Sequence, residues 1–313
     1  MKHLIDMSQF TRFLVNSLIQ HADRMKSIVK KGVLDDRLRG KTLISLYYEP
    51  STRTMCSFQS AMIKLGGSNI FIADKFSSTE KGESIEDTIK TLNCYGDAIV
   101  LRHPEKGSSK IAASISDIPV INAGDGNGEH PTQALLDIYT IYSELGSIGG
   151  KLGHPMRILF VGDLKNSRTV HSLIQVLCLY ENIEFIYISP IGLEMPDEIK
   201  DYISHHRITQ ITEYHLLEAI SVADVVYSTR IQKERFDVNA NVNAKTLSLQ
   251  YQITPDLMSR AKPNMILMHP LPRNDEISRE VDADPRAVYF KQMEYGVYMR
   301  MAILDWIICD NLN

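Results

Sequence analysis

The sequence predicts an α/β protein with two doubly wound parallel-sheet domains joined by long interdomain helices. Its 313 residues suit two domains of ordinary size. Short apolar segments of strand length alternate with amphipathic segments of helix length, a pattern typical of parallel sheets covered by helices. The alternation occurs twice, on either side of a long helical pattern that starts at Pro131.

The first alternation begins with a helix over residues 8–31, where apolar side chains recur with helical spacing. Thr42–Tyr48 follows as a strand, and Thr52–Leu65 follows as a helix that the pair Gly66-Gly67 ends. The other elements expected here are strands at 69–73, 97–102 and 118–122, helices at about 84–95 and 108–115, and a helix from 131 to about 145.

The second alternation has the same organisation. The expected strands are 157–162, 184–189, 208–212, 224–228 and 264–268, and the expected helices are 168–180, 197–204, 214–221 and 254–261. A last helix is expected from about 286 to 309. We therefore expect one domain from residues 1–141 together with 289–313, and a second domain from residues 142–288.

Composition excludes several classes of protein. A hydrophobic content of 44% with 23% charged residues supplies a core and excludes disorder. The net charge of −4 gives no basic field for nucleic acid or anionic lipid. No apolar run approaches the roughly 18 residues of a membrane span, and the polar N-terminus does not resemble a secretory signal. The four cysteines form no C-x-x-C pair, so we expect a cytoplasmic protein.

Candidate functional residues follow the strands of the first half, because ligands of open α/β sheets bind beyond the carboxyl ends of strands. Ser51–Thr54 opens a helix, where free N–H groups and the helix dipole suit a phosphate. Ser and Thr are also ordinary N-cap residues, but an arginine in the first turn is better explained by a bound anion. Arg102 follows the third strand, and the glycine-rich loop from Asn122 leads to His130 and Gln133 at another helix start.

The second half repeats this theme in three segments, Gly162–Thr169, Thr229–Arg235 and His269–Arg273. Each follows an expected strand and carries at least one arginine. A solvated charged face is the ordinary explanation of such a cluster, but the recurrence of arginine at strand ends favours recognition of planar anions. We expect a small polyanionic ligand held between the domains.

The motifs that are absent narrow the function further. The sequence has neither G-x-G-x-x-G after a first strand nor G-x-x-x-x-G-K-[ST], which disfavours a generic nucleotide-binding protein. It has no G-x-S-x-G or H-E-x-x-H motif, and no cluster with metal-ligand spacing. We expect no metal and no cofactor.

Taken together, the motifs resemble the aspartate/ornithine transcarbamoylase family, from about residue 40 to about residue 305. The matching segments are Ser51–Thr54, Arg102–Pro104, His130–Gln133, Gly162–Ser172, Arg230–Arg235 and His269–Arg273. An ornithine-specific member is expected to carry His-Cys-Leu-Pro in place of His269-Pro-Leu-Pro272, and a Ser-Met-Gly motif that is absent here. The resemblance is therefore to the aspartate-specific catalytic chains.

The resemblance implies transfer of a carbamoyl group from carbamoyl phosphate to the α-amine of L-aspartate, a step of pyrimidine biosynthesis. The residues that it assigns to the phosphate are Ser51, Thr52, Arg53, Thr54 and Ser77. Those assigned to the carbonyl oxygen are Thr54, Arg102 and His130, and those assigned to the carbamoyl NH₂ are Gln133, Leu271 and the adjoining Pro272. Those assigned to aspartate are Lys81, Arg168, Arg230 and Gln232.

The resemblance further implies a homotrimer, because Ser77 and Lys81 lie on a loop that reaches the neighbouring subunit's site in this family. It is compatible with regulatory chains. Two alternatives stay open at this point: a transcarbamoylase for another amine acceptor, and an inactive transcarbamoylase-like scaffold. The chain also departs from the family at Met55 and Gln59, where Arg and Glu are usual, and at Glu294-Tyr-Gly296, where Asn-Gly is usual.

Overall fold

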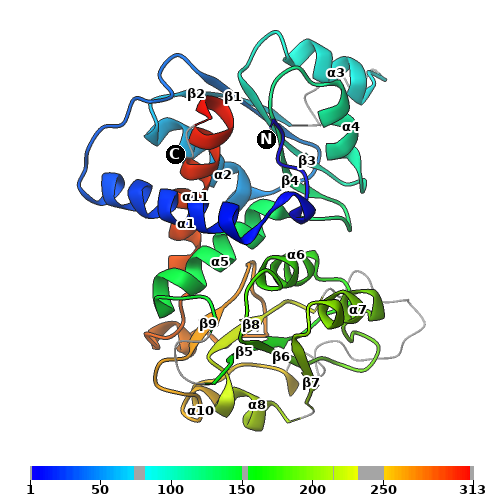
Figure 1. Cartoon of the computed structure of the whole chain (residues 1–313), viewed down its shortest axis with the longest axis vertical. Helices are drawn as coiled ribbons and strands as arrows, with labels where there is room; N and C mark the ends of the chain where they lie inside the picture. Colours follow the sequence, from blue (N-terminus) through cyan, green and yellow to red (C-terminus); the bar gives the residue numbers. More distant parts are fainter. Residues whose placement is uncertain (1, 74–81, 150–153, 214, 232–249, 311–313) are drawn as a thin grey trace. The chain divides into compact units, whose positions relative to one another are not determined.

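The structure, a computed structural model, describes residues 2–73, 82–149, 154–213, 215–231 and 250–310 (Figure 1). The chain forms two compact units, Met1–Tyr139 with Met293–Asn313, and Thr140–Gln292. The division falls within helices α5 (Pro131–Leu145) and α11 (Tyr289–Cys309). Each unit contains an all-parallel sheet with helices, which confirms the predicted fold class. The domain boundaries expected from the sequence stay a prediction.

The first unit is built on a four-stranded sheet with the strand order β2-β1-β3-β4. Its strands are β1 (Thr42–Tyr47), β2 (Ser68–Ala73), β3 (Ala98–His103) and β4 (Val120–Asp125). The central strands β1 and β3 are apolar and mostly buried, as expected for parallel strands covered on both faces. Ile44 and Ile99 join one core cluster with side chains of helices α3 (Ile85–Leu92) and α4 (Ser108–Ile115).

Helices α1 (Arg12–Lys30) and α2 (Thr52–Lys64) complete this unit together with the C-terminal part of α11. The helix expected from residue 8 begins later, at Arg12, because local hydrogen bonds favour a different start. The side chain of Gln9 accepts from the backbone N–H of Ile5 at 2.6 Å, and Met7–Gln9 forms a 3-10 turn. Thr11 then caps α1 by accepting from the N–H of Leu14 at 3.3 Å.

Strand β4 extends further than the sequence indicated. Residue Leu4 pairs with it: the N–H of Leu4 donates to Val120 and the N–H of Asn122 donates to Leu4, both at 2.8 Å. On its other side, β4 pairs with β3 as far as Asp125. The expectation that the glycine-rich loop begins at Asn122 is therefore wrong, because pairing on both sides keeps these residues extended.

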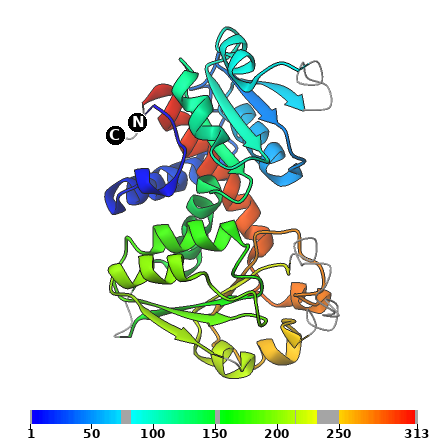
Figure 2. The ribbon, with the colours of Figure 1, turned by 90° about the vertical axis from the view of Figure 1, so that its right-hand side faces the viewer.

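The second unit is built on a five-stranded sheet with the order β7-β6-β5-β8-β9. Its strands are β5 (Met156–Val161), β6 (Ile183–Ile188), β7 (Thr209–Thr212), β8 (Val225–Ser228) and β9 (Ile266–Met268). Its further helices are α6 (Arg168–Leu177), α7 (Asp197–His205), α8 (Leu216–Val222) and α10 (Pro255–Met258). Figures 1 and 2 show α6 and α7 on one face of this sheet and α8 and α10 on the other.

Helices α6, α10 and α11 are shorter than expected. Helix α6 ends at Leu177 instead of residue 180. The helix expected at 254–261 is the single turn α10, and the last helix starts at Tyr289 instead of residue 286, after a 3-10 turn at Arg279–Ala283. Within the described ranges, no helix is long and apolar enough to cross a membrane.

Candidate active site

The first candidate cluster begins at the N-terminus of α2, directly after β1. Ser51 is the N-cap residue, but its hydroxyl makes no capping hydrogen bond to the helix. The first turn contains no acidic residue. Thr54 is buried, whereas Thr52 and Arg53 are exposed. The helix dipole and the N–H groups of the first turn are therefore arranged to favour an anion.

Two guanidinium groups lie close together at this helix terminus. Arg102 donates from Nη1 to the carbonyl oxygen of Ala123 at 3.0 Å, and from Nε to Oε2 of Glu49 at 3.2 Å. Burial lowers the pKa of Arg102, and burial together with the positive charge of Arg102 lowers the pKa of Arg53. Because the charge of Arg102 disfavours the protonated form of Arg53, an anion bound beside these groups would stabilise them.

The start of α5 adds an imidazole and an amide to the same unit. His130 directly precedes Pro131 and is buried, and its carbonyl oxygen accepts from the N–H of Gln133 at 2.9 Å. The side chain of Gln133 donates from Nε2 to Oδ1 of Asp137 at 2.9 Å. Because β4 is the neighbour of β3, the start of α5 lies at the same carboxyl edge of the sheet as Arg102.

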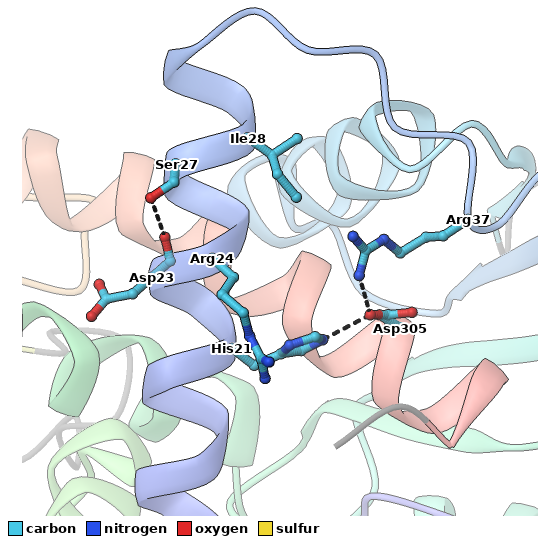
Figure 3. A pocket seen from close by; sticks show the side chains of 7 residues that line it. All are labelled: His21, Asp23, Arg24, Ser27, Ile28, Arg37 and Asp305. Carbon is cyan, nitrogen blue, oxygen red and sulfur yellow. Dashed lines mark hydrogen bonds and ion pairs between the residues drawn. The ribbon is translucent and has the colours of Figure 1, made fainter. Parts of the chain in front are cut away.

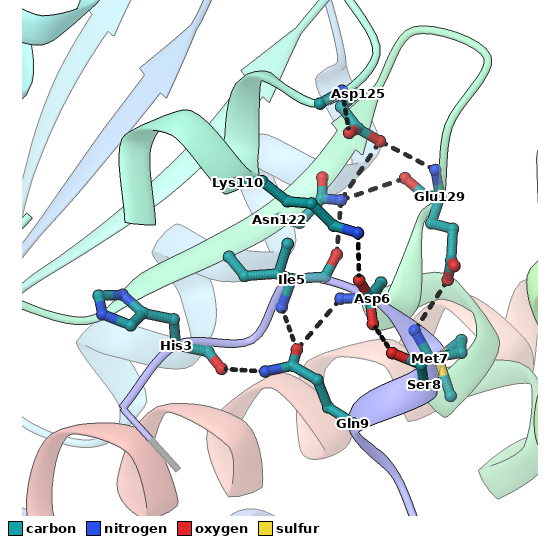
Figure 4. Close-up of polar contacts among 11 residues, drawn as sticks. His3, Ile5, Asp6, Met7, Ser8, Gln9, Lys110, Asn122, Asp125 and Glu129 are labelled. Carbon is teal, nitrogen blue, oxygen red and sulfur yellow. Dashed lines mark hydrogen bonds and ion pairs between the residues drawn. The ribbon is translucent and has the colours of Figure 1, made fainter. Parts of the chain in front are cut away.

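Hydrogen bonds hold the segment that leads to α5 (Figure 4). Oδ1 of Asp125 accepts from the backbone N–H of Glu129 at 2.9 Å, and Oε2 of Glu129 accepts from the backbone N–H of Met7 at 2.8 Å. The amide of Asn122 donates to the carbonyl oxygen of Ile5 at 2.8 Å. The loop that precedes His130 is therefore anchored at both ends to the N-terminal segment of the chain.

The second candidate cluster lies at the carboxyl edge of the second sheet. Gly162 directly follows strand β5. Its φ of 118° falls in the left-handed region, and a Cβ there would lie 2.3 Å from the carbonyl oxygen of Thr229. Oδ1 of Asp163 then accepts from the backbone N–H of Asn166 at 2.9 Å, which closes the turn into α6. Arg168 is the first residue of α6, and no acidic residue lies in its first turn.

Arg230 belongs to the same edge because its strand, β8, is the neighbour of β5. The N–H of Thr229 donates to the carbonyl oxygen of Val161 at 2.8 Å, so the pairing of the two strands continues to the residue before Arg230. Arg230 is half-buried, as is Arg168. The second unit therefore carries two arginines on loops that leave adjacent strands.

The segment after β9 contributes the backbone around Leu271. The N–H of Leu271 donates to Nδ1 of His269 at 2.8 Å, so the other imidazole nitrogen carries the proton and donates to Oε1 of Glu276 at 2.8 Å. Leu271 has a φ of 56°, which a residue other than glycine seldom adopts, and its bond to Pro272 is cis. Burial acts to raise the pKa of Glu276, but the interactions with His269 and the hydrogen bonds from backbone N–H groups together outweigh it and hold that pKa below its ordinary value.

Arg273 closes the same segment and makes its contacts within the second unit. Both of its terminal nitrogens pair with the carboxylate of Asp282, with Nη2 at 2.6 Å from Oδ2, and Nη1 also donates to the hydroxyl of Tyr289 at 2.9 Å. The donors of Arg273 therefore hold the 3-10 turn against α11, and we assign this arginine no contact with the ligand.

Sequence reasoning assigned no role to Glu49, Asp137 and Glu276, each of which contacts a candidate site residue. For two of these three residues the sequence contains a signal that could have indicated the contact. Glu49 lies at the same strand end as Ser51, and Asp137 follows Gln133 by one helical turn, so the two share a helix face. Three expected residues, Ser77, Lys81 and Gln232, lie outside the described residues.

A separate pocket of about 650 Å³ in the first unit contains none of the expected site residues (Figure 3). It is lined by residues of α1, of α11 and of the segment between α1 and β1. His21 Nε2 and Arg37 Nη1 lie 2.8 Å and 2.6 Å from the same oxygen, Oδ2 of Asp305. These charged groups therefore hold the helices together, and we assign them no part in the chemistry.

Comparison with known families now bears on both clusters. Residues 2–143 match the model for the carbamoyl-P binding domain of aspartate/ornithine carbamoyltransferases, and residues 154–307 match the model for their Asp/Orn binding domain. The chain belongs to the aspartate/ornithine carbamoyltransferase family. The resemblance noted in the sequence is thereby confirmed.

Several members of this family are similar over nearly the whole chain. Aspartate carbamoyltransferase 3, chloroplastic, of Pisum sativum is 43% identical over 307 residues, which cover 97% of this chain and 77% of the relative. Multifunctional protein pyr1-3 of Dictyostelium discoideum is 48% identical over 304 residues. The match covers 97% of this chain but only 13% of that relative's length.

Solved structures of carbamoyltransferases agree with the fold. The catalytic subunit of aspartate transcarbamoylase from M. jannaschii superposes with a TM-score of 0.92 at 43% identity, covering 99% of both chains. Aspartate transcarbamoylase from Trypanosoma cruzi in complex with N-(phosphonacetyl)-L-aspartic acid superposes with a TM-score of 0.91 at 43% identity, covering 98% of this chain and 95% of the other.

Proposed function

We propose that this chain transfers the carbamoyl group of carbamoyl phosphate to the α-amine of L-aspartate, giving N-carbamoyl-L-aspartate and phosphate in pyrimidine biosynthesis. The observation that carries the proposal is the pair of cations Arg53 and Arg102 near the N-terminus of α2, whose first turn contains no acidic residue. The relatives support it, since the Trypanosoma cruzi enzyme has been solved with carbamoyl phosphate and aspartate bound.

The first cluster serves the carbamoyl donor. The groups that bind its phosphate are Ser51, Thr52, Arg53 and Thr54, with Ser77 supplied by a neighbouring subunit. Arg102, His130 and Thr54 donate hydrogen bonds to the carbonyl oxygen, where negative charge grows as the tetrahedral intermediate forms. Arg102 suits this task because Glu49 and Ala123 fix its orientation on two sides.

The carbamoyl NH₂ requires acceptors. Gln133 supplies its side-chain oxygen, and the backbone carbonyl of Leu271, next to Pro272, supplies a second acceptor. The hydrogen bond from Leu271 to His269 supports that backbone in its left-handed conformation. These two acceptors favour a carbamoyl group over an ester or acyl group that lacks NH₂, because a buried acceptor left without a donor costs free energy.

The second cluster serves aspartate. Arg168 and Arg230 pair with its two carboxylates, and Gln232 and Lys81 add donors. Guanidinium groups suit this task because their planar fork matches a carboxylate. A cationic acceptor such as ornithine would meet like charge here, so this cluster favours the diacid.

The chemistry is direct attack of a neutral amine on the carbonyl carbon. Catalysis then consists of positioning and of charge stabilisation, with no covalent enzyme intermediate. The departing phosphate is the proton acceptor. His130 acts as a hydrogen-bond donor to the carbonyl oxygen, and not as the general base.

The proposal includes a cytoplasmic homotrimer with active sites shared between subunits. Supporting it, β2 is an edge strand of the first sheet and exposes the apolar side chains Ile70 and Phe71, and Ile63 of α2 is exposed as well. Exposed apolar groups of this kind mark interaction surfaces. Regulatory chains and allosteric control are compatible with this assembly.

The test is transfer from labelled carbamoyl phosphate to aspartate and to ornithine in parallel. We expect transfer to aspartate alone, and a raised apparent KM for aspartate in Arg230→Ala. Transfer to ornithine would select another acceptor, and no transfer to any amine would favour an inactive scaffold. An unchanged aspartate dependence in Arg230→Ala would remove that residue from the site.

A further inference from the structure

The side-chain amide of Gln133 has a defined orientation in this structure. Its Nε2 donates to Oδ1 of Asp137 at 2.9 Å, one turn further along α5. A carboxylate only accepts hydrogen bonds, so the amide must present nitrogen and not oxygen to it. The oxygen Oε1 therefore points away from Asp137, and within the described part of the chain it accepts no hydrogen bond.

Asp137 is a fully buried carboxylate, which needs a compensating charge. The positive charge of the buried Arg300 of α11 interacts favourably with this carboxylate. This arginine is only 3% exposed, and burial lowers its pKa to about 10 while the charge of Asp137 acts in the opposite direction. Arg300 therefore stays protonated at neutral pH, and Asp137 has a nearby cation within the same unit.

The surroundings of Arg300 are shaped for a guanidinium group. The group lies over the ring of Phe58, with Cζ 5.1 Å from the ring centroid, and Nη1 donates to the carbonyl oxygen of Gly296 at 3.3 Å. A Cβ at position 296 would lie 2.7 Å from Nη1 and 3.2 Å from Leu136, so glycine leaves the space that the guanidinium occupies. The cation is thus built into the packing of α2, α5 and α11.

We propose that Asp137 is a positioning residue for substrate recognition, which fixes the Gln133 amide so that Oε1 accepts from the NH₂ of the carbamoyl group, with Arg300 as its buried counter-charge. The inference rests on the proposed function and deepens it. An inverted amide would present NH₂ to the substrate's NH₂, two donors with no acceptor. Asp137 thereby sets the preference for a carbamoyl group over an acyl group of the same shape.

Acetyl phosphate is the probe that isolates this role, because it carries a methyl group where carbamoyl phosphate carries NH₂. The measurement is the dissociation constant of each compound, by calorimetry, and the preference is the ratio of the two. In Asp137→Asn we expect the preference for carbamoyl phosphate to fall about tenfold, the size of one hydrogen bond, with acetyl phosphate binding unchanged. Asp117→Asn, which removes an exposed carboxylate of the same unit, is the matched control and should keep the wild-type preference.

A double-mutant cycle separates positioning from general support of the fold. In Gln133→Ala the preference is already lost, so adding Asp137→Asn should change it by less than about twofold. An equal loss for both ligands, or the same loss with and without Gln133, would overturn the proposal. So would a folded Asp137→Asn protein that keeps the wild-type preference.

Arg300 provides a second route should Asp137→Asn fail to fold. Arg300→Gln removes the counter-charge and should lower the same preference, and Arg300→Lys should restore it. An unchanged preference in Arg300→Gln would overturn the part assigned to Arg300. If the wild-type chain bound no carbamoyl phosphate, the proposed function itself would fail. If the wild-type chain bound carbamoyl phosphate and the variants kept the wild-type preference, only the positioning role would fail.

Discussion

His269 and Glu276 form a buried hydrogen-bonded pair, with Nε2 of the imidazole 2.8 Å from Oε1 of the carboxylate. The pair fixes the tautomer of His269, so that Nδ1 is free to accept from the backbone N–H of Leu271. A carboxylate to which sequence reasoning assigned no role thereby supports the backbone that we assign to the carbamoyl NH₂.

Replacing Glu276 by leucine should destabilise the protein. The buried Nε2–H of His269 would lose its acceptor, at a cost of about 1–3 kcal/mol. Urea denaturation followed by circular dichroism measures this cost. Glu280→Leu is the control, since Glu280 is exposed in the neighbouring 3-10 turn and its loss should change stability by less than about 0.5 kcal/mol. Equal effects of the two substitutions would contradict a special role for the pair.

The same pair predicts a dependence of stability on pH. The pKa of Glu276 is lower in the folded chain than in the unfolded chain, since the interactions with His269 and with backbone N–H groups together outweigh burial. Its contribution is therefore complete above the unfolded pKa of the carboxyl group and is lost as the pH falls through the folded pKa. The urea midpoint of the wild type should fall more steeply than that of Glu276→Gln on acidification from pH 6 to pH 3. Parallel curves would show that this carboxylate is not the titrating group.

Arg102 should be indispensable for turnover. Arg102→Ala removes a donor to the developing oxyanion, and kcat should fall by about 10²–10³. Arg102→Lys should recover little of this, because an ammonium group cannot contact Glu49 and Ala123 together as the guanidinium does. Arg24→Ala, at an exposed position of α1, is the control and should leave kcat unchanged. A fall of less than tenfold in Arg102→Ala would argue against its contact with the carbonyl oxygen.

Gly162 should be sensitive to a single added methyl group. Gly162→Ala combines a left-handed backbone with a contact of 2.3 Å to Thr229, so we expect a loss of stability greater than that of Gly192→Ala. Gly192 also has a left-handed φ, of 85°, but nothing lies within 4 Å of its added Cβ. Because Gly162 holds the Arg168 and Arg230 loops together, its substitution should also raise the KM for aspartate. Equal melting temperatures for the two variants would show that the close approach is unimportant.

Shared active sites predict recovery of activity in mixed assemblies. Arg53→Ala and Lys81→Ala chains should each be inactive alone. Trimers that contain both should regain some activity, because a wild-type Arg53 from one chain meets a wild-type Lys81 from another. The measurement is carbamoyl transfer after joint refolding, with each variant refolded alone as the reference. Well-formed mixed trimers without activity would mean that each site is complete within one chain.

The sequence predicted most of the fold because its strands are apolar segments bounded by glycine, proline or charged residues. Errors arose where long-range pairing decides the structure. Asn122–Asp125 is rich in small and polar residues, yet it is extended because Leu4 and β3 bind it on both sides. The start of α1 is likewise decided by Gln9 and Thr11, whose hydrogen bonds leave the apolar periodicity unchanged.

The candidate site residues could be predicted because the ends of strands and the starts of helices could be located in the sequence. His130 and Arg168 stand where the sequence placed them, one before and one at the start of a helix. Side-chain partners were less predictable where the fold brings them together, as for Arg102 with Glu49 and Ala123. Arg273 has the same local pattern as the other arginines, and only the proximity of Asp282 and Tyr289 distinguishes it.

The bridge between Leu4 and Ile121 has a practical consequence for handling the protein. Strand β4 is the last in its sheet, and the N-terminal residues shield its outer side. Proteolytic removal of the residues before Phe10 would expose the outer edge of β4 to pairing with strands of other molecules, so cleaved preparations should aggregate. The same cleavage would release Glu129 from Met7 and loosen the turn into α5, so under the proposed function such material should lose activity before it precipitates.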